Sequence, residues 1–367
     1  MKLCIIYNFA QHYRTGIFKL ISDEFDADFF FGDSMADVKK MDYSVLHGPV
    51  HESHVKRCGG ISYQPGVIGL LWRNYTTYLM LGDTRSLSTW LFLLLSKFHP
   101  NKKFFLWTHG WYGKESTIEK FLKRVFFRLP NGGVFLYGNY ARSLMTKDGF
   151  NPDKLFTLHN SLDYDSQLIT REKLSKTAIY KNHFVNDNFN LVFIGRLTPV
   201  KKLDMILKAM AICSKEYKLD VNCTFVGGGT EEQKLKSLAD SLGLKEKVWF
   251  YGACYDEVQI GELIYNADVC VSPGNVGLTA MHSLVFGTPV ITHNDFKLQM
   301  PEFEAIIDGK TGAFFQSGSS AQLAQVIHDW LVNNKDRREE VRFACYKEID
   351  DSWNPYFQLK VLKEHLC

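Results

Sequence analysis

Two cations stand where a strand is expected to turn into a helix, in the segment FIGRLTPVKKLDMILKAM, residues 193–210. Arg196 follows Gly195 at the end of the expected strand, and Lys201 comes just before the expected helix. Arginine offers a planar fork of donors and lysine a mobile point charge, so this pair can hold a diphosphate and stabilise the charge on it as it leaves. The alternative is a basic turn that is merely solvated.

A glycine-containing loop leads into a helix in the segment SPGNVGLTAMHSLVFGTPVITH, residues 272–293. Gly277, Leu278 and Thr279 precede or begin the expected helix AMHSLVF. The free N–H groups and the dipole at a helix start favour an anion, and a glycine lets a ligand approach the backbone closely. This loop is therefore suited to contact an anion such as phosphate.

The first half of the chain places polar residues at the ends of two expected strands. His12, Tyr13 and Arg14 follow the strand LCIIY (3–7), and His109 ends the strand KFFLWTHG (103–110). Cleft residues belong at the carboxyl ends of strands in such sheets. We expect the first three to contact an acceptor molecule, with a surface turn as the equal alternative. A neutral imidazole at 109 can hydrogen-bond a substrate or accept a proton.

Short apolar strands alternate with helical patterns along the chain, which predicts an α/β fold with parallel sheets. The sequence favours two doubly wound, Rossmann-like domains that face one cleft. We expect residues 1–175 to form an acceptor domain and residues 176–350 a nucleotide-sugar domain, with a helix over 351–367 that packs back on the first. The polar stretch 165–187 is expected to be a linker, and Thr230 with Gln233 a capping box for the helix that follows. In the first half, strands are expected near 3–7, 27–32, 77–82, 103–110, 133–138 and 155–161, and helices near 16–24, 86–98, 116–128 and 139–147.

The composition is that of an ordinary globular protein. The chain has 367 residues, 46% apolar and 23% charged, with a net charge of +3, which gives no argument for nucleic-acid binding. Its eight cysteines form no CxxC pair, so we expect buried thiols in a reducing compartment and no metal site. The start MKLCIIYNF is expected to be a first strand and not a signal peptide.

One expected helix, STIEKFLKRVFFRL (116–129), is both basic and amphipathic. Such a helix can lie on an anionic membrane surface. Its apolar face is equally suited to packing against the sheet, with the cations merely solvated. Both interpretations are compatible if the apolar face packs against the sheet and only the basic side contacts the lipid headgroups.

The second half resembles the family-4 retaining glycosyltransferases of the GT-B fold. GRLTPVKKLD is similar to their GRLxxxKG turn, and GLTAMHSLVFGTPVITH to GLPxLEAMAxGxPVVA. FVGGG…FYGACYDE…ADVCVSP is similar to VGxG…FxGxV…ADVxVxPS, and FEAIIDGKTGAFF to PEIVEDGxTGxLV. These matches run from about 189 to 330 in the order that the family has them.

The resemblance implies that Arg196 and Lys201 hold the donor diphosphate and that a family histidine facing the donor sugar corresponds to His109. It implies further donor contacts, and it also shows where this sequence differs from the family's motifs. The two glutamates of the family's E-x7-E motif fall at Gly274 and His282, and Lys202 replaces a glycine. We expect His282 to keep one bond to the ribose and the sugar contacts to be rebuilt. The remaining donor-site residues implied are Gly195, Gly228, Asn275, Gly277, Leu278, Thr279 and Glu304.

The predicted function is transfer of a sugar from a UDP- or GDP-linked donor to a glycan or lipid-linked acceptor, with retention of configuration and without a metal or further cofactor. By resemblance, such an enzyme works in bacterial surface polysaccharide synthesis, capsule or lipopolysaccharide. It is expected to be cytoplasmic or peripheral on the inner face of the cytoplasmic membrane. Two alternatives stay open: a sugar-nucleotide 2-epimerase of the same fold, and an inactive relic that binds a nucleotide or glycan.

Overall fold

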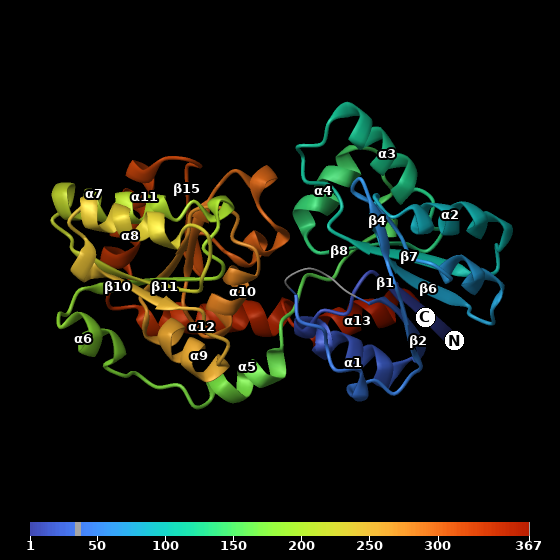
Figure 1. The fold of residues 1–367 in the computed structure, drawn as a ribbon, viewed down its shortest axis with the longest axis horizontal. Helices are drawn as coiled ribbons and strands as arrows, with labels where there is room; N and C mark the ends of the chain where they lie inside the picture. Colours follow the sequence, from blue (N-terminus) through green and yellow to red (C-terminus); the bar gives the residue numbers. More distant parts are fainter. Residues whose placement is uncertain (34–37, 367) are drawn as a thin grey trace. The chain divides into compact units, whose positions relative to one another are not determined.

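The structure, a computed structural model, describes residues 1–33 and 38–366. The chain divides into two compact units (Figure 1). The N-terminal unit comprises Met1–Tyr164 and the chain from Ser352 onward, and the C-terminal unit comprises Asp165–Asp351. The last helix, α13, Pro355–Leu366, therefore belongs to the first unit, although it comes last in the sequence.

A seven-stranded sheet in the order β3-β2-β1-β6-β7-β8-β9 forms the centre of the N-terminal unit. Every neighbouring pair of these strands is parallel. The first strand, β1, lies between β2 and β6, so the chain reverses its direction of growth beside β1. In sheets of this kind, ligands bind outside the carboxyl ends of the strands at such a switch point. The strands are β1 (Lys2–Tyr7), β2 (Asp26–Gly32), β3 (Val50–Ser53), β6 (Thr77–Leu81), β7 (Lys103–Thr108), β8 (Gly133–Leu136) and β9 (Leu155–Thr157).

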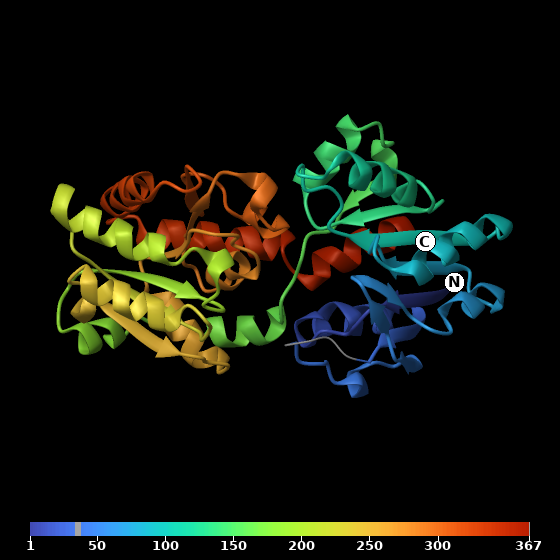
Figure 2. The same ribbon diagram turned by 45° about the horizontal axis from the view of Figure 1, so that its top comes forward.

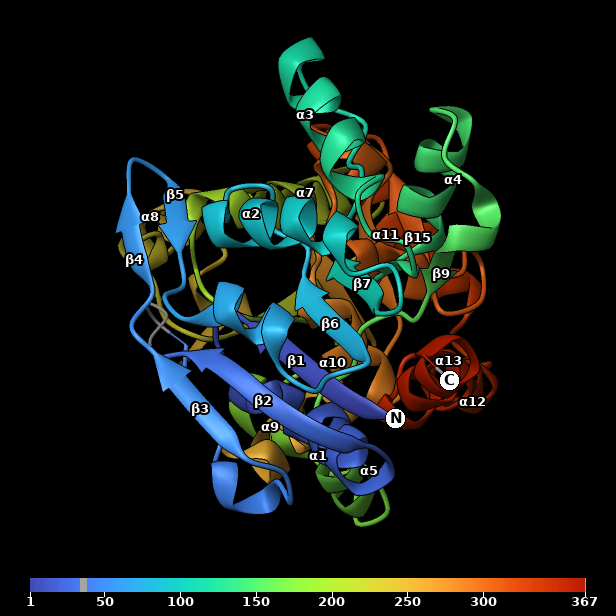
Figure 3. The same ribbon diagram turned by 90° about the vertical axis from the view of Figure 1, so that its right-hand side faces the viewer.

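Side chains of β1 alternate between two hydrophobic cores, because successive residues of a strand point to opposite faces of the sheet. Leu3, Ile5 and Tyr7 belong to the core beneath α1 and α13, whereas Cys4 and Ile6 belong to the core beneath α2, α3 and α4. Figure 3 shows α1 and α13 on one side of this sheet and α2 and α3 on the other. The helices are α1 (Thr15–Glu24), α2 (Leu87–Leu95), α3 (Thr117–Phe127) and α4 (Asn139–Lys147).

The C-terminal unit holds a six-stranded parallel sheet in the order β12-β11-β10-β13-β14-β15. Its first strand, β10, is again flanked on both sides, which puts the switch point between β10 and β13. Helices α7, α8 and α11 lie on one face of the sheet, and α6, α9 and α12 on the other (Figures 1 and 2). The strands are β10 (Phe189–Ile194), β11 (Val221–Val226), β12 (Val248–Gly252), β13 (Val269–Ser272), β14 (Val290–His293) and β15 (Gly312–Phe315). The helices are α5 (Tyr164–Arg171), α6 (Ile179–Phe184), α7 (Asp204–Glu216), α8 (Glu232–Ser241), α9 (Glu257–Asn266), α10 (Leu278–Val285), α11 (Ser320–Asn333) and α12 (Arg338–Ser352).

The stretch 165–187 is not an unstructured linker. It contains most of α5 and all of α6, and polar side chains hold α5 to the C-terminal unit. Gln167 Nε2 donates to Glu257 Oε1 at 2.9 Å, and Arg171 forms an ion pair with Asp350 at 2.9 Å. The unit boundary accordingly falls between Tyr164 and Asp165. The sequence pattern missed these helices because polar contacts, more than a broad apolar face, fasten α5.

Two further expectations were wrong in detail, and one element was not foreseen. Helix α8 begins at Glu232 with Glu231 at its N-cap position and without a side-chain cap, so Thr230 and Gln233 form no capping box. An antiparallel hairpin of β4 (Lys56–Cys58) and β5 (Ile61–Tyr63) was not predicted. It leaves Cys58 exposed, so not every thiol is buried, and Cys367 lies outside the described residues.

Helix α3 does not bury its whole apolar face. Phe126 and Phe127 lie in the core, but Ile118 and Phe121 are 75% and 60% exposed. Packing against the sheet therefore accounts for only the last turn of this helix. Among the described residues, no helix has both the length and the apolar character needed to cross a bilayer.

Candidate functional site

The loops after β10 and β13 meet at the switch point of the C-terminal sheet. Gly195 follows β10 with a φ of 139°, a conformation that favours glycine. The Thr279 hydroxyl, at the start of α10, donates to the Ile194 carbonyl at 2.9 Å. A Cβ atom added at Gly195 would lie 3.5 Å from Thr279 Oγ1. The structure thus brings together the two segments that the sequence singled out as phosphate-binding.

Lys201 points into this junction and contacts the loop after β13. Its Nζ donates to the Asn275 carbonyl at 2.7 Å, to Asn275 Oδ1 at 3.1 Å and to the Val276 carbonyl at 3.4 Å. Burial lowers the pKa of Lys201 to about 8; the Glu302 carboxylate opposes this shift, and Arg196 adds to it. A cation that is partly desolvated and held by neutral oxygens is well placed to bind an anion.

Arg196 lies on the same turn but is exposed. Within the described part of the chain, its guanidinium forms no hydrogen bond or ion pair. It is nevertheless close enough to lower the pKa of Lys201 through charge repulsion. The two predicted cations therefore share one edge of the sheet, with Lys201 directed inward and Arg196 available to a ligand. Lys202, where a glycine was expected from the resemblance, adopts the left-handed conformation with a φ of 49°.

Helix α10 begins at this junction with a backbone that only glycine adopts readily. Gly277 has φ 52° and ψ −147°, and its added Cβ would lie 4.0 Å from Lys201 Nζ. The Val276 N–H is bonded to Gln299 Oε1 at 2.8 Å, and Gln299 is itself buried and bonded to Thr292 at 2.9 Å. Gln299 was not among the site residues selected from the sequence, and the structure makes it the support of the loop.

The positions of the two missing glutamates have different environments. A Cβ atom at Gly274 would lie 2.0 Å from the Val200 carbonyl oxygen and 2.7 Å from Lys201 Cα, so the backbone of the Lys201 turn occupies that space. His282 has a carboxylate beside it, since its Nε2 lies 2.9 Å from Glu257 Oε1. Burial raises the pKa of Glu257, but the bonds from His282 and Gln167 outweigh it and leave the pKa lowered. An ionised carboxylate, supplied by α9, thus stands next to the residue that replaces the second glutamate.

Two glutamates lie in the short 3-10 helix Pro301–Ala305. Glu304, which the sequence selected, is half-buried, whereas Glu302 is buried and acts on the charge of Lys201. Glu302 was missed because the spacing to Asp308 in the family motif matches Glu304. No pattern in the sequence around Glu302 indicates that it is buried. Gly228 accepts a bond from the Leu197 N–H at 3.0 Å, which joins the β10 and β11 turns beside the same edge.

A cavity of about 460 Å³ opens at the switch point of the N-terminal sheet. Tyr13 and Arg14, from the turn before α1, line it together with His109 at the end of β7. His12 does not line it: this side chain is exposed, and its Nδ1 lies 3.2 Å from the Lys39 carbonyl. The cavity is lined by residues after β1 (Asn8, Gln11), after β6 (Gly82, Asp83, Thr84, Arg85) and by Tyr7, Leu81, Thr108, Gly110, Tyr112, Glu119, Lys123, Phe127 and Tyr137.

His109 is neutral at physiological pH. Burial, reinforced by the charges of Arg14 and Lys123, lowers its pKa to about 4. Its ring lies against Tyr137, with centroids 4.7 Å apart. A neutral imidazole at a cavity wall can accept a proton or a hydrogen bond, as the sequence predicted for this residue.

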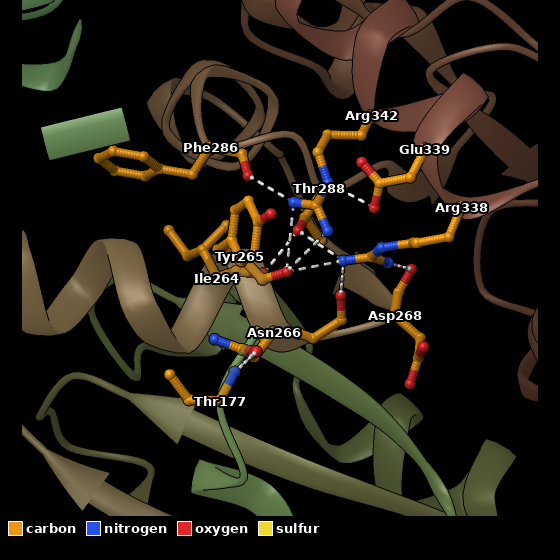
Figure 4. Close-up of polar contacts among 11 residues, drawn as sticks. Thr177, Ile264, Tyr265, Asn266, Asp268, Phe286, Thr288, Arg338, Glu339 and Arg342 are labelled. Atoms are coloured by element: carbon orange, nitrogen blue, oxygen red, sulfur yellow. Dashed lines mark hydrogen bonds and ion pairs between the residues drawn. The ribbon is translucent and has the colours of Figure 1, made fainter. Parts of the chain in front are cut away.

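A second cavity, of about 720 Å³, lies in the C-terminal unit at the amino ends of β10 and β13. Figure 4 shows Arg338 and Arg342 on this side, directed at backbone carbonyl groups. Arg338 donates to the carbonyls of Asp268 at 2.7 Å and Tyr265 at 2.9 Å, and Arg342 stacks on the Tyr265 ring. These guanidinium groups thus bond backbone oxygens of the protein and fasten α12 to the rest of the unit. The carboxyl edge of the sheet is therefore the candidate binding edge.

Known proteins resemble this chain most clearly over its C-terminal unit. Residues 175–345 match the family of glycosyl transferases group 1. The putative glycosyltransferase EpsD of Bacillus subtilis (strain 168) is 28% identical over 193 residues, which is 49% of this chain and 49% of that protein. An uncharacterized glycosyltransferase of Haemophilus influenzae is 22% identical over 250 residues, 67% of this chain and 65% of that protein. The match thus spans less than two thirds of each of these curated relatives.

Solved structures resemble the whole chain. HepE of Anabaena, in complex with UDP, has a TM-score of 0.74 at 16% identity and covers 99% of both chains. The lipopolysaccharide outer core galactosyltransferase WaaB, in its apo form, has a TM-score of 0.71 at 12% identity, over 100% of this chain and 99% of that chain. At such identity these neighbours establish the fold. Residues 175–345 of this chain thus match the glycosyl transferases of group 1, within a chain that has the GT-B fold.

Proposed function

We propose that this protein is a glycosyltransferase that moves a sugar from a nucleoside-diphosphate sugar to an acceptor hydroxyl. The observation that supports this most strongly is the junction of Lys201 with the start of α10, at the switch point of a sheet with the nucleotide-binding strand order. A diphosphate there would meet the exposed Arg196 and the free N–H groups of the helix start. The negative charge that develops on the diphosphate as it leaves would be stabilised by groups that are already in place.

We propose that Arg196 and Lys201 supply the positive charge that a divalent metal supplies in other transferases. The bond between the anomeric carbon and the diphosphate oxygen would break, with its electron pair going to the diphosphate. The acceptor hydroxyl would form the new bond to the anomeric carbon as its proton passes to a nearby base. Attack on the same face would retain the configuration. Neutral His109, at the wall of the N-terminal cavity, is the group that we assign to the sugar or to that proton.

UDP is the nucleotide that we propose first, because HepE has been solved with UDP and with UDP-glucose. Within the C-terminal unit, the pair of His282 with Glu257 offers a carboxylate and an imidazole for the ribose hydroxyls. Gly195, Gly228, Asn275 and Gly277 to Thr279 surround the diphosphate in this proposal, and Glu304 reaches the donor sugar.

Thermal-shift measurements with UDP, GDP and ADP test the donor assignment. A ligand at 100 times its Kd should stabilise the protein by about 2.7 kcal/mol. The variant Arg196→Ala should then lower turnover at least about 100-fold, because the charge-stabilising contact is worth roughly 2.7 kcal/mol or more. Turnover that is unchanged in a folded Arg196→Ala protein would contradict the proposal.

A second candidate is a nucleotide-binding protein without transfer activity. The backbone that fills the space beside Gly274 favours it, since the family glutamate expected there contacts the donor sugar. Tight UDP binding without hydrolysis or transfer, across a panel of UDP-sugars and acceptors, would decide for this candidate.

We further propose that the protein acts on a lipid-linked glycan in surface polysaccharide synthesis, at the inner face of the cytoplasmic membrane. The support is an apolar surface on α2, α3 and the turn after α2. Trp90 of α2 packs against Phe126 of α3, with ring centroids 4.8 Å apart, so the two helices are neighbours. Lys120 and Arg124 share Asp148, which leaves one excess positive charge beside the surface. The exposed apolar side chains are Leu87, Leu91, Leu94, Phe98, Ile118, Phe121, Leu122 and Val125.

Vesicle co-sedimentation tests this surface. Phe121→Ser should weaken binding to anionic phosphatidylglycerol vesicles by about tenfold or more, because burying one phenylalanine contributes about 1.5–3 kcal/mol. Phe343→Ser is the matched control: Phe343 is 68% exposed, but it lies on α12 of the C-terminal unit. Equal binding by both variants and the unchanged protein would remove the membrane assignment and leave the transfer reaction untouched.

A further inference from the structure

Arg14 is a buried cation with unmet hydrogen-bonding capacity. Only 6% of the side chain is exposed, and it lies at the wall of the N-terminal cavity, where the 3-10 turn His12–Arg14 leads into α1. Its Nη2 donates to the Tyr137 hydroxyl. Its Nε and Nη1 atoms are buried and have no hydrogen-bond partner among the described residues. Leaving donors of a charged group unpaired in a protein interior is costly.

No carboxylate in the described chain forms an ion pair with this guanidinium. Four aromatic rings surround it instead, those of Tyr7, Tyr13, Trp107 and Tyr137, with the guanidinium carbon 5.2–6.0 Å from their centroids. Burial raises the pKa of Tyr7 and Tyr137, although the Arg14 charge works against it, so both phenols are neutral at physiological pH. The rings attract the cation, but they leave its charge uncompensated.

The other buried cations are satisfied by the protein itself. Lys123, in the same cavity, lies 2.8 Å from Glu115 and 3.7 Å from Glu119. Arg342 of the C-terminal unit lies 3.3 Å from the Glu339 carboxylate and donates to the Tyr265 carbonyl at 3.3 Å (Figure 4). This contrast indicates that Arg14 is kept for a partner that is not part of the chain.

A second polar group in the cavity also lacks a partner. Asn8 follows β1, lines the same cavity, and has a buried Oδ1 atom without a hydrogen-bond partner among the described residues. The start of α1, directly after Arg14, adds the positive end of a ten-residue helix. The cavity thus offers charged donors for an anion, an amide for a hydroxyl, and His109 at its wall.

We propose that the acceptor carries an oxyanion, a phosphate or a carboxylate, that binds the unpaired Nη1 donors of Arg14, while a neighbouring hydroxyl bonds Asn8. This inference rests on the proposed transfer function, since it names the chemical class of the acceptor. Nη1 and Nε lie on different edges of the guanidinium, so Nη1 donates to the oxyanion and Nε is left for a second oxygen atom of the ligand. Acidic sugars and sugar phosphates have both an oxyanion and hydroxyls, whereas neutral sugars lack the group that Arg14 requires.

The test titrates the full-length protein, saturated with UDP so that the donor edge is occupied, with glucose 1-phosphate, glucuronate and glucose. Calorimetry should detect binding of at least one charged sugar and much weaker binding of glucose. Arg14→Gln should weaken the charged sugar at least about tenfold, which equals about 1.4 kcal/mol, and leave UDP binding unchanged. Arg14→Lys should recover part of the loss, because it keeps the charge but not the separate Nη1 and Nε donors. Lys19→Gln, which removes an exposed cation from α1, should have no effect.

Several results would overturn this inference. They are equal affinity for glucose and the charged sugars, the same affinity in Arg14→Gln and Lys19→Gln, or no binding of either charged sugar to the UDP-saturated protein. Preference for glucose 1-phosphate over glucuronate would select phosphate, and the reverse preference carboxylate. Failure of UDP itself to bind would refute the donor assignment, and the same titration without UDP would still report on Arg14. A cooperative thermal transition of Arg14→Gln, matched to that of Lys19→Gln, checks that the N-terminal unit is folded.

Discussion

The buried amine of Lys201 should make nucleotide binding depend on pH in a way that can be calculated. Burial lowers its pKa from the ordinary value of 10.5 to about 8, against the attraction of Glu302. Lysine is charged below its pKa, so the charge that a diphosphate needs is present at pH 7 and is lost as the pH rises through about 8. If only the charged form binds, the apparent Kd for UDP should rise about twofold at pH 8 and about tenfold at pH 9.

The same group should change folding stability in the opposite direction. Its pKa is lower in the folded protein than in the unfolded chain, so between pH 8 and about 10 the unfolded state binds more protons. The contribution of Lys201 to the free energy of unfolding is therefore unfavourable below pH 8 and becomes less so as the pH rises. Weaker UDP binding at pH 9 would then not reflect a loss of structure at this turn.

The assay is calorimetric titration of UDP between pH 6.5 and 9 with three proteins: the unchanged chain, Lys201→Met and Lys202→Met. Methionine fills the space of the lysine stem but does not titrate. We expect Lys201→Met to bind UDP weakly and without the pH dependence, and the exposed neighbour Lys202→Met to keep it. Identical pH profiles for the unchanged protein and Lys201→Met would show that another group, or the nucleotide itself, causes the dependence, and the assignment of Lys201 would fail.

Two further substitutions probe the rebuilt positions of the donor edge. Gly274→Ala should lower the free energy of unfolding by about 1–3 kcal/mol in urea denaturation, because its Cβ would overlap the Val200 carbonyl. In the matched control Gly228→Ala the nearest neighbour of the Cβ would lie at 3.9 Å, so the free energy of unfolding should change by much less. Equal values for the two variants would contradict the geometry. His282→Ala should raise the Kd for UDP about three- to tenfold, the worth of one hydrogen bond to the ribose 2′-hydroxyl, but leave the Kd for 2′-deoxy-UDP unchanged. An equal loss for both nucleotides would exclude a bond to that hydroxyl.

The sequence predicts much of this architecture because its strands and helices are locally encoded. Apolar strands such as LCIIY and FNLVFI, separated by helical patterns, place β1 and β10 within a residue or two of their observed bounds. Glycine at 195 and 277 marks the turns correctly, since only glycine adopts those angles readily. The two segments that meet at the donor edge could thus be named before their geometry was known.

Contacts between distant segments could not be predicted in the same way. Nothing near His282 in the sequence indicates that Glu257 of α9 lies 2.9 Å from its ring. Helix α5 was assigned to a linker because its attachment depends on polar side chains of other helices. The directions of the two cations also depend on tertiary structure, since Lys201 turns toward the Asn275 carbonyl and Arg196 toward solvent.

The loss of the first glutamate and the inward direction of Lys201 are best understood as one change. The Gly274 N–H donates to the Lys201 carbonyl at 2.9 Å, a contact that holds the two loops together. A side chain at 274 would collide with this turn, so the turn can take its position only when that residue is glycine. The left-handed Lys202 then directs the chain into α7. A glutamate restored at 274 would therefore displace the lysine turn before it could reach a sugar, and in the proposed reaction the donor sugar must be recognised by other residues of the donor edge.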